Sequence, residues 1–116
     1  MNTRGEKIKK ALIKELSQII QQGLNDPRIE GIITVTDVDL SPDYRYAKVY
    51  ISIFGEDEHK KQVMEAIEDS NSLIRREISR RIRLKHTPEL NFTLDESIEK
   101  NAKINDLLDK ISRGEL

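Results

Sequence analysis

The feature that most constrains the fold of this chain is a strict alternation of apolar and other side chains between Arg45 and Phe54. Successive side chains of a β-strand point to opposite faces of a sheet, so the alternation predicts a strand with one buried face and one face in water. The apolar set is Ala47, Val49, Ile51 and Ile53, and the other set is Tyr46, Lys48, Tyr50 and Ser52. A strand of this kind requires a paired neighbour and a second layer that covers its apolar face.

The segment Ile32 to Leu40 is the expected neighbour, because it is rich in β-branched residues. Its apolar positions change phase along the segment, which predicts a β-bulge near Thr36-Asp37. Ser41-Pro42-Asp43 follows with residues typical of a tight turn, so the two segments are expected to form an antiparallel hairpin. A third alternating stretch, Glu89 to Leu94, predicts another strand.

Further stretches show apolar residues at spacings of three and four, the pattern of amphipathic helices. The expected helices run from about Thr3 to Leu24, from Asp57 or Glu58 up to Ser70-Asn71-Ser72, from about Leu73 to Leu84, and from about Ser97 onward with Ile98, Leu107, Leu108 and Ile111 as apolar positions. Ser70-Asn71-Ser72 predicts a kink or a new helix cap, because these side chains compete for backbone hydrogen bonds. The expected fold class is α+β in two layers, with the order α-β-β-α-α-β-α and a three-stranded sheet that carries its helices on one face.

Length and composition favour one domain over residues 1–116, with about 97–116 as a C-terminal helical extension. Apolar residues make up 36% of the chain, which suffices for one hydrophobic core. Cysteine is absent, which excludes disulfides, thiol catalysis and zinc sites with cysteine ligands. Residues 1–10 lack the apolar segment of a secretory signal, and no apolar run is long enough to span a bilayer, so a cytoplasmic location is expected.

The charges of the chain are balanced overall but segregated along it. The 20 basic and 21 acidic residues give a net charge of -1, whereas the segment Arg75 to Lys85 is strongly basic and contains one acid, Glu77. On a helix, Arg76, Arg80 and Arg83 fall together on the side opposite the apolar residues. The candidate phosphate-binding residues of this segment are Arg75, Arg76, Arg80, Arg83 and Lys85.

Two interpretations of the basic segment are open. Arginine donates two parallel hydrogen bonds through a planar fork, which suits phosphate, and like charges on one helix face repel one another, so a nucleic-acid partner explains why they gather. Alternatively, the segment is an ordinary solvated basic face whose charges are balanced by acids such as Glu77 and Asp69.

The junction of Ser70, Asn71 and Ser72 is a second candidate site. Free N–H groups at the start of the next helix can bind a phosphate, and the hydroxyls and the amide add donors. Alternatively, the three residues form only a local N-cap, which is common for these residue types.

Tyr46 and Tyr50 share the face of the sheet that is expected to meet water. Aromatic side chains on such a face stack on bases in some sheet-based RNA binders. Aromatic residues are also simply favoured in strands, where they shield the backbone, and that is the more common role.

No pattern in the chain predicts an enzyme, a metal site or a cofactor site. His59 and His86 lie on different predicted elements, without a serine–aspartate pair or metal-ligand spacing around them. The glycine motifs of phosphate-binding and dinucleotide-binding loops are absent from the sequence. A binding protein is therefore favoured over an enzyme.

The order of elements, with a basic helix after an inter-helix junction, resembles a type II KH domain, and the local sequence resembles the bacterial ribosome-binding factor A family. The matching stretches are Asn25-Asp26-Pro27-Arg28, Ile33 to Val38, Leu40 to Tyr50, Leu73 to Ile78, Arg81 to Lys85, Thr87 to Phe92 and Asp95 to Glu99. The resemblance adds Arg28 and Arg45, at loop positions that match the family, as candidates to extend the RNA contact surface. Between the two central helices the family has an Ala-x-Gly kink, where this chain has Ser70-Asn71-Ser72. Because the chain departs from the family at this junction but matches it along the basic helix, the resemblance places the binding on the basic helix.

The resemblance implies a monomeric, cytoplasmic assembly factor that is not an enzyme. Such a factor binds 16S ribosomal RNA in free, immature 30S subunits late in maturation, supports formation of the 5′ end of that RNA and helps growth in the cold. Two other functions stay open, namely a general single-stranded RNA-binding KH module and a protein-interaction domain that docks through the acidic helix Glu56 to Asp69.

Overall fold

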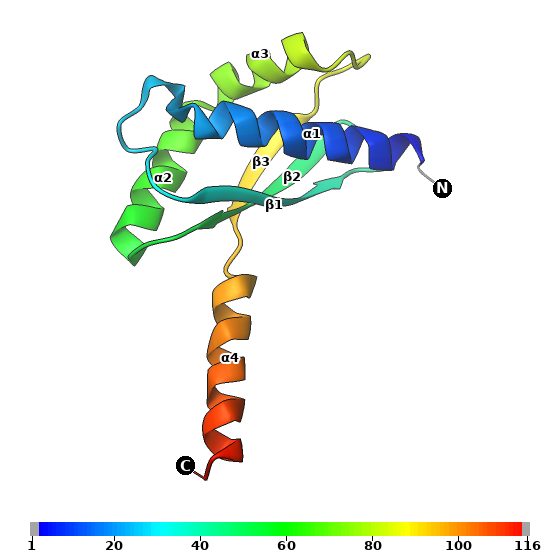
Figure 1. Cartoon of the computed structure of the whole chain (residues 1–116). Helices are drawn as coiled ribbons and strands as arrows, with labels where there is room; N and C mark the ends of the chain where they lie inside the picture. Colours follow the sequence, from blue (N-terminus) through cyan, green and yellow to red (C-terminus); the bar gives the residue numbers. More distant parts are fainter. Residues whose placement is uncertain (1–2, 115–116) are drawn as a thin grey trace.

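The computed structural model describes residues 3–114, with the side chains of residues 23 and 98–105 outside that description. In chain order the elements are α1 (Arg4–Gln21), a short 3-10 helix η1 (Gly23–Asn25), β1 (Ile33–Leu40), β2 (Tyr46–Ile53), α2 (Asp57–Asp69), α3 (Asn71–Arg81), β3 (Glu89–Leu94) and α4 (Ser97–Ser112). Figure 1 shows their arrangement in space. The predicted α+β class and the order α-β-β-α-α-β-α are confirmed.

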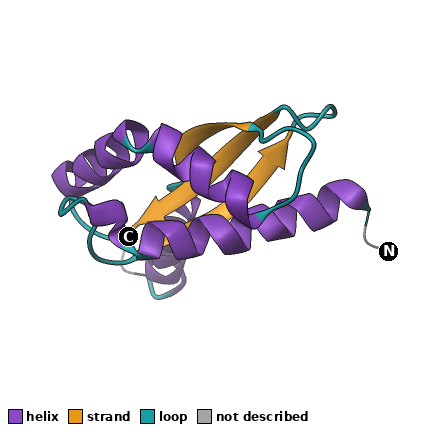
Figure 2. Ribbon diagram, turned by 90° about the horizontal axis from the view of Figure 1, so that it is seen from above, coloured by secondary structure: helices purple, strands orange, loops and turns teal. Residues whose placement is uncertain are grey.

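β2 is the central strand of a three-stranded sheet with the order β1-β2-β3. It pairs antiparallel with β1, as the turn at Ser41-Pro42-Asp43 predicts, and parallel with β3 (Figure 2). The pairing with β1 shifts register between Val35 and Asp37, so the predicted bulge lies at Thr36. Parallel strands need a crossover connection, and α2 and α3 provide it between β2 and β3.

Helices α1, α2 and α3 cover one face of the sheet (Figures 1 and 2). Along β2, alternate side chains are buried beneath these helices, whereas Tyr46 and Lys48 are exposed, as the alternation predicts. The fully buried residues of the core include Leu12, Leu16, Ile19 and Ile20 of α1, Val38, Val49 and Ile51 of the sheet, and Val63, Ile67, Ile74 and Ile78 of α2 and α3. Burial of Ile74 and Ile78 fixes the inner face of α3 and turns the opposite face of this helix toward solvent.

Ser70 separates α2 from α3, which confirms the predicted interruption between these helices. Its backbone angles are φ -96° and ψ 7°, but its N–H still donates to the carbonyl oxygen of Ala66 at 3.1 Å. Its own carbonyl oxygen accepts from the N–H of Ile74 at 2.9 Å, so the chain bends while its backbone hydrogen bonds continue. The Ser70 hydroxyl makes no capping hydrogen bond, and the kink therefore forms without the predicted side-chain cap.

α3 ends at Arg81, before the predicted end at Leu84. Ile82 has extended backbone angles, φ -122° and ψ 124°, and residues 82–88 lead back to the start of β3. The turn has a physical cause in packing, because Ile82 and Leu84 pack against the core. The predicted position of Arg83 on the outer face of α3 is therefore wrong, because Arg83 follows the helix.

α4 projects away from the sheet and from the other helices (Figure 1). Its predicted apolar positions Leu107, Leu108 and Ile111 are about half exposed. The side chain of the fourth predicted apolar position, Ile98, lies outside the described residues. Among the described side chains of α4, none belongs to the buried core.

Candidate nucleic-acid interface

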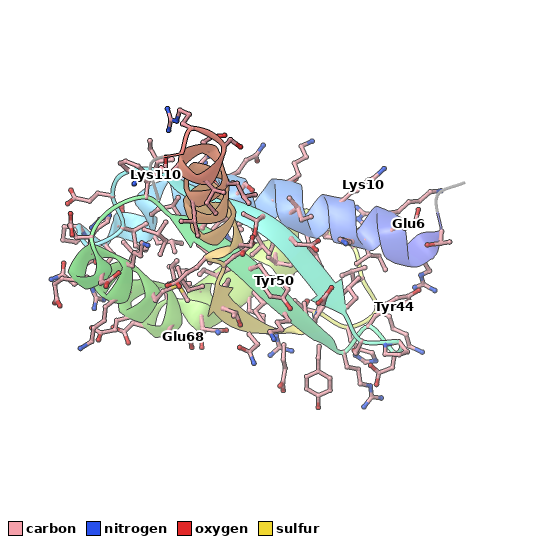
Figure 3. All side chains as sticks on the ribbon, turned by 90° about the horizontal axis from the view of Figure 1, so that it is seen from below. Glu6, Lys10, Tyr44, Tyr50, Glu68 and Lys110 are labelled. Atoms are coloured by element: carbon pink, nitrogen blue, oxygen red, sulfur yellow. The ribbon has the colours of Figure 1, made fainter. Side chains whose placement is uncertain are left out.

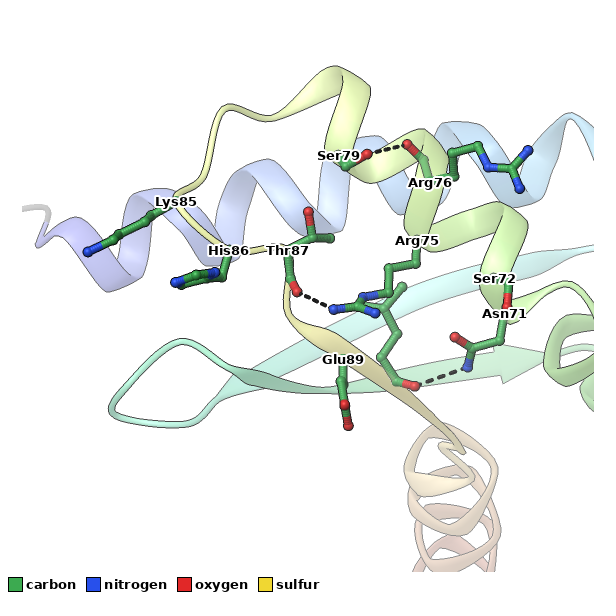
Figure 4. Close-up of a pocket in the computed structure, with 10 residues that line it drawn as sticks. Asn71, Ser72, Arg75, Arg76, Ser79, Lys85, His86, Thr87 and Glu89 are labelled. Atoms are coloured by element: carbon green, nitrogen blue, oxygen red, sulfur yellow. Dashed lines mark hydrogen bonds between the residues drawn. The ribbon is translucent and has the colours of Figure 1, made fainter.

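An open groove of about 670 Å³ lies between α3, residues 82–88 and β3 (Figure 4). The residues that line it are Asn71, Ser72, Arg75, Arg76 and Ser79 of α3, Lys85, His86 and Thr87 of the connection, and Glu89 and Leu90 of β3. We call it the α3–β3 groove. It brings together five of the predicted site residues, namely Asn71, Ser72, Arg75, Arg76 and Lys85.

Arg75 connects the two walls of the α3–β3 groove. Its Nη2 donates to the carbonyl oxygen of Thr87 at 2.8 Å (Figure 4), and its Nε donates to the carbonyl oxygen of Pro88 at 3.2 Å. Because both acceptors are neutral carbonyl groups, these hydrogen bonds do not balance the positive charge of the guanidinium. Arg75 thus holds the chain in place just before β3 and still offers a cation to the groove.

Arg76 and Lys85 are the other cationic side chains of the groove, and both are exposed. Within the described part of the chain, no carboxylate lies within ion-pair distance of either group. A guanidinium donates two parallel hydrogen bonds to a phosphate, and an ammonium group attracts a phosphate as a point charge. These two side chains are therefore available to an anionic partner.

Asn71 and Ser72 lie at one end of the groove, and Lys85 and His86 lie at the other (Figure 4). The Nδ2 of Asn71 donates to the carbonyl oxygen of Leu90 at 3.1 Å and so ties the start of α3 to β3. Asn71 therefore acts as a brace across the two elements. Ser70, the third member of the predicted junction site, does not line the groove.

Arg80 and Arg83 also lie outside the groove lining, although the sequence pattern groups both with Arg76. The Nη1 of Arg80 lies 3.3 Å from the Oε1 of Glu77 in the same helix, and 72% of the Arg80 side chain is exposed. Arg83 lies beyond the end of α3. The predicted face of three arginines is thus divided, and only Arg76 of the three reaches the groove.

Acids balance part of the basic helix, as one of the two interpretations of the sequence expects. Glu77 pairs with Arg80 and also lies 3.7 Å from the Nε of Arg81. Arg81 in turn lies 3.3 Å from Glu15 of α1. The balanced charges are therefore those of Arg80 and Arg81, which leaves the positive charge of α3 concentrated on the side of the groove.

A family model described as ribosome-binding factor A matches residues 4–108 of the chain. The chain belongs to the ribosome-binding factor A family. It is 46% identical over 112 residues to ribosome-binding factor A of Clostridium tetani, which covers 97% of this chain and 93% of that protein. It is 48% identical over 105 residues to ribosome-binding factor A of Clostridium novyi, which covers 90% and 87%.

Solved structures of the ribosome-binding factor A family share this fold. The crystal structure of the Thermus thermophilus protein matches with a TM-score of 0.65 and 30% identity, over 76% of this chain and 92% of that one. A solution structure of a Thermotoga maritima protein, described as a putative ribosome binding factor A, matches with a TM-score of 0.64 and 34% identity, over 85% and 95%. A Thermus thermophilus model fitted into a map of its complex with the 30S subunit matches with a TM-score of 0.61 and 30% identity, over 74% and 89%.

Arg28, which the resemblance to the ribosome-binding factor A family singles out, lies away from the groove lining. Its Nη2 lies 2.7 Å from the Oδ2 of Asp26 and 3.0 Å from the Oδ2 of Asp69. Hydrogen bonds to Asp26 and then to Asp69 raise the pKa of Arg28, and the hydrogen bonds from Arg28 lower the pKa of Asp26. Two carboxylates thus balance this arginine, which fits a structural role in the loop before β1.

Arg45, the other residue that the family resemblance adds, lies beside the groove. It lines a hollow of about 270 Å³ that shares Arg75, His86, Thr87 and Glu89 with the α3–β3 groove. Its Nε is 3.9 Å from the Oδ2 of Asp43, a long ion pair between exposed side chains. The Ser41 hydroxyl and then the N–H of Arg45 lower the pKa of Asp43. Arg45 therefore extends the positive surface toward the hairpin.

The sequence pattern did not single out five of the lining residues, namely Ser79, His86, Thr87, Glu89 and Leu90. It presents His86 only as an isolated histidine, and Glu89 and Leu90 only as residues of a strand. The signal that could have found His86, Thr87 and Glu89 is their position around Pro88. These residues connect α3 to β3, and the residues that lead from a helix into the next strand lie beside that helix.

The described residues offer neither a metal site built from several ligands nor a membrane-spanning helix. Among them, no group of three or more His, Asp or Glu side chains could hold a metal ion. No helix in this part of the chain is long and apolar enough to cross a membrane. The concentration of cations around the groove is thus the feature of these residues that best supports ligand binding.

Proposed function

We propose that this chain binds 16S ribosomal RNA in immature 30S subunits through the α3–β3 groove and catalyses no reaction. The observation that carries the proposal is that Arg75, Arg76 and Lys85 line one open groove, with no carboxylate of the described residues paired to any of them. Cations placed in this way neutralise backbone phosphates and release their counterions, which drives binding to nucleic acids.

The family supports the choice of partner. The Thermus thermophilus relative was fitted into a map of its complex with the 30S subunit, and the present chain shares 30% of its residues over the matched part. A groove with an open mouth and cationic walls fits an RNA strand better than a small molecule, because small-molecule sites are usually deeper and mostly apolar.

The proposed action is a shift of an RNA folding equilibrium. A protein that binds one conformation of 16S rRNA more tightly than another raises the population of that conformation without breaking or forming covalent bonds. We infer that the chain acts in this way as a cytoplasmic monomer late in 30S maturation. It thereby supports formation of the 5′ end of 16S rRNA, and it helps growth in the cold, where misfolded RNA rearranges slowly.

The test is the affinity for purified immature 30S subunits, measured across a range of salt concentrations. Arg76→Gln and Lys85→Gln should each weaken binding, and each should reduce the slope of log affinity against log salt by about 0.7 to 0.9. Arg80→Gln is the matched control, because it removes one charge of the same helix from outside the groove. It should have a clearly smaller effect on affinity and slope.

Equal effects of all three substitutions would show that the general charge of α3 and of the connection after it, and not the groove, attracts the RNA. Unchanged affinity for Arg76→Gln and Lys85→Gln would contradict the proposal altogether.

Sedimentation separates the proposed partner from the two other functions that the sequence left open. When cell extract is separated on a density gradient, the chain should sediment with free 30S subunits. Ribonuclease treatment should release the chain from these subunits. If the chain stays bound to another protein after ribonuclease treatment, docking through α2 would be favoured. If the chain binds unrelated oligonucleotides as tightly as it binds 30S subunits, a general RNA-binding module would be favoured.

A further inference from the structure

We propose that Tyr46 stacks on an unpaired base of the RNA strand whose backbone lies in the α3–β3 groove. This inference rests on the proposed function and assigns the groove a second kind of contact. Its ligand is a nucleobase in a single-stranded segment, because bases inside a duplex do not offer their faces to a side chain.

Tyr46 is the first residue of β2, and 58% of its surface is exposed. It lines the hollow of about 270 Å³ together with Arg45, and this hollow shares Arg75, His86 and Thr87 with the groove. An RNA strand that leaves the groove past His86 and Thr87 therefore meets the side chain of Tyr46 next.

One charged neighbour of Tyr46, the carboxylate of Glu89, is better suited to a base than to a phosphate. Glu89 lies directly opposite Tyr46 in the parallel pairing of β2 with β3, and its carboxylate repels phosphate. A carboxylate does accept hydrogen bonds from the exocyclic amino groups of bases. Around a further hollow of about 530 Å³, Tyr46 and Glu89 are joined by Lys48, Glu68 and Asn91, which add polar groups suited to a base edge.

The other two tyrosines are already engaged within the protein. The Tyr50 hydroxyl donates to the Oδ2 of Asp39 at 3.1 Å, and the Nζ of Lys48 lies 5.3 Å from the centre of the Tyr50 ring. The Tyr44 ring lies 5.7 Å from the guanidinium carbon of Arg4. Among the described residues, no cationic or aromatic side chain is paired with the Tyr46 ring, so its faces remain available for stacking. Figure 3 shows the sheet face that carries Tyr50 and the turn that carries Tyr44.

The first test is the affinity of Tyr46 variants for immature 30S subunits. Tyr46→Phe keeps the aromatic ring and should bind like the unaltered protein. Tyr46→Leu loses the ring and should bind about tenfold more weakly, since stacking of one base on an aromatic side chain contributes on this scale. Phe54→Leu is the matched control, because Phe54 is 74% exposed and follows the opposite end of β2, so its affinity should not change.

The results separate this inference from the proposed function. Normal binding by Tyr46→Leu, together with weak binding by Arg76→Gln, overturns the stacking and leaves the groove assignment in place. Equal losses in Tyr46→Phe and Tyr46→Leu also overturn it, because the hydroxyl and not the ring would then make the contact. If neither Tyr46→Leu nor Arg76→Gln alters binding, both assignments are wrong.

The second test identifies the class of partner at this position. The chain contains no tryptophan, so Tyr46→Trp introduces a single indole whose fluorescence reports its own surroundings. An unstructured oligoribonucleotide should quench this fluorescence, and the same sequence in a duplex should quench it much less. Phe54→Trp should respond to neither. Lack of quenching by the single strand, at concentrations where the oligonucleotide binds, would refute the inference.

Discussion

The Nη1 of Arg81 lies 3.3 Å from the Oε2 of Glu15, so the last turn of α3 is tied to the middle of α1. Both side chains are partly buried, with 26% and 21% of their surfaces exposed. Arg76, in the same helix, lines the α3–β3 groove without such a partner among the described residues. Two arginines of one short basic segment therefore have different roles, and substitutions should separate them.

Arg81→Gln should lower the free energy of unfolding by about 1 kcal/mol, because it breaks a partly buried ion pair and leaves Glu15 uncompensated. Denaturant unfolding followed by circular dichroism measures this change. Affinity for 30S subunits should fall much less than in Arg76→Gln. The opposite pattern, a stable protein that no longer binds, would place Arg81 in the interface.

Arg75→Lys should destabilise the fold by about 1 kcal/mol while it keeps the charge. The planar fork of arginine reaches the carbonyl oxygens of Thr87 and Pro88 together, and an ammonium group cannot reproduce that geometry. The same replacement at Arg76, which makes no such bonds to the chain, should leave the free energy of unfolding unchanged. Equal unfolding curves for both variants would contradict a bracing role for Arg75.

Asn71→Ala should cost about 1 kcal/mol of stability, because the carbonyl oxygen of Leu90 loses the amide that donates to it at 3.1 Å. Hydrogen exchange should also speed up locally at the start of α3 and in β3. Ser72→Ala is the control, since this neighbouring side chain is exposed and its removal should change stability by less than about 0.5 kcal/mol. A similar loss of stability in both variants would show that any substitution at the start of α3 destabilises the fold, and that the hydrogen bond to Leu90 is not the cause.

Asp95 should make the stability depend on pH in the acid range. Hydrogen bonds from Ser97, and then from the Thr36 hydroxyl at 2.7 Å, lower the pKa of Asp95 below its usual 3.8. The unfolded chain therefore takes up this proton more readily than the folded one, so the contribution of Asp95 is complete above pH 3.8 and is lost as the pH falls through the lower folded pKa.

The check for Asp95 compares unfolding of the protein and of Asp95→Asn at several pH values. The protein should be more stable than the variant above about pH 4, and this difference should shrink as the pH falls below the ordinary carboxyl pKa. A difference that stays constant down to the acid limit would show that ionisation of Asp95 does not contribute.

Local patterns in the sequence predicted most of the architecture. The alternation between Arg45 and Phe54 became β2, the phase change of the preceding segment became the bulge at Thr36, and the polar junction became the break at Ser70. These features follow from the side-chain period and the hydrogen-bonding chemistry of neighbouring residues, which the sequence displays directly. The end of α3 at Arg81 was not predictable in this way, because it depends on how the following residues pack against the core.

The sequence by itself determined where positive charge gathers. Only the tertiary structure decided what Arg75 and Arg81 do, because the role of each depends on a partner that is remote along the chain. Glu15 is 66 positions from Arg81, and the carbonyl oxygen that Arg75 reaches belongs to Thr87, 12 positions away. Arg76 lines the groove, and folding brings no carboxylate of the described residues to its guanidinium; a lack of partners of this kind cannot be read from a sequence.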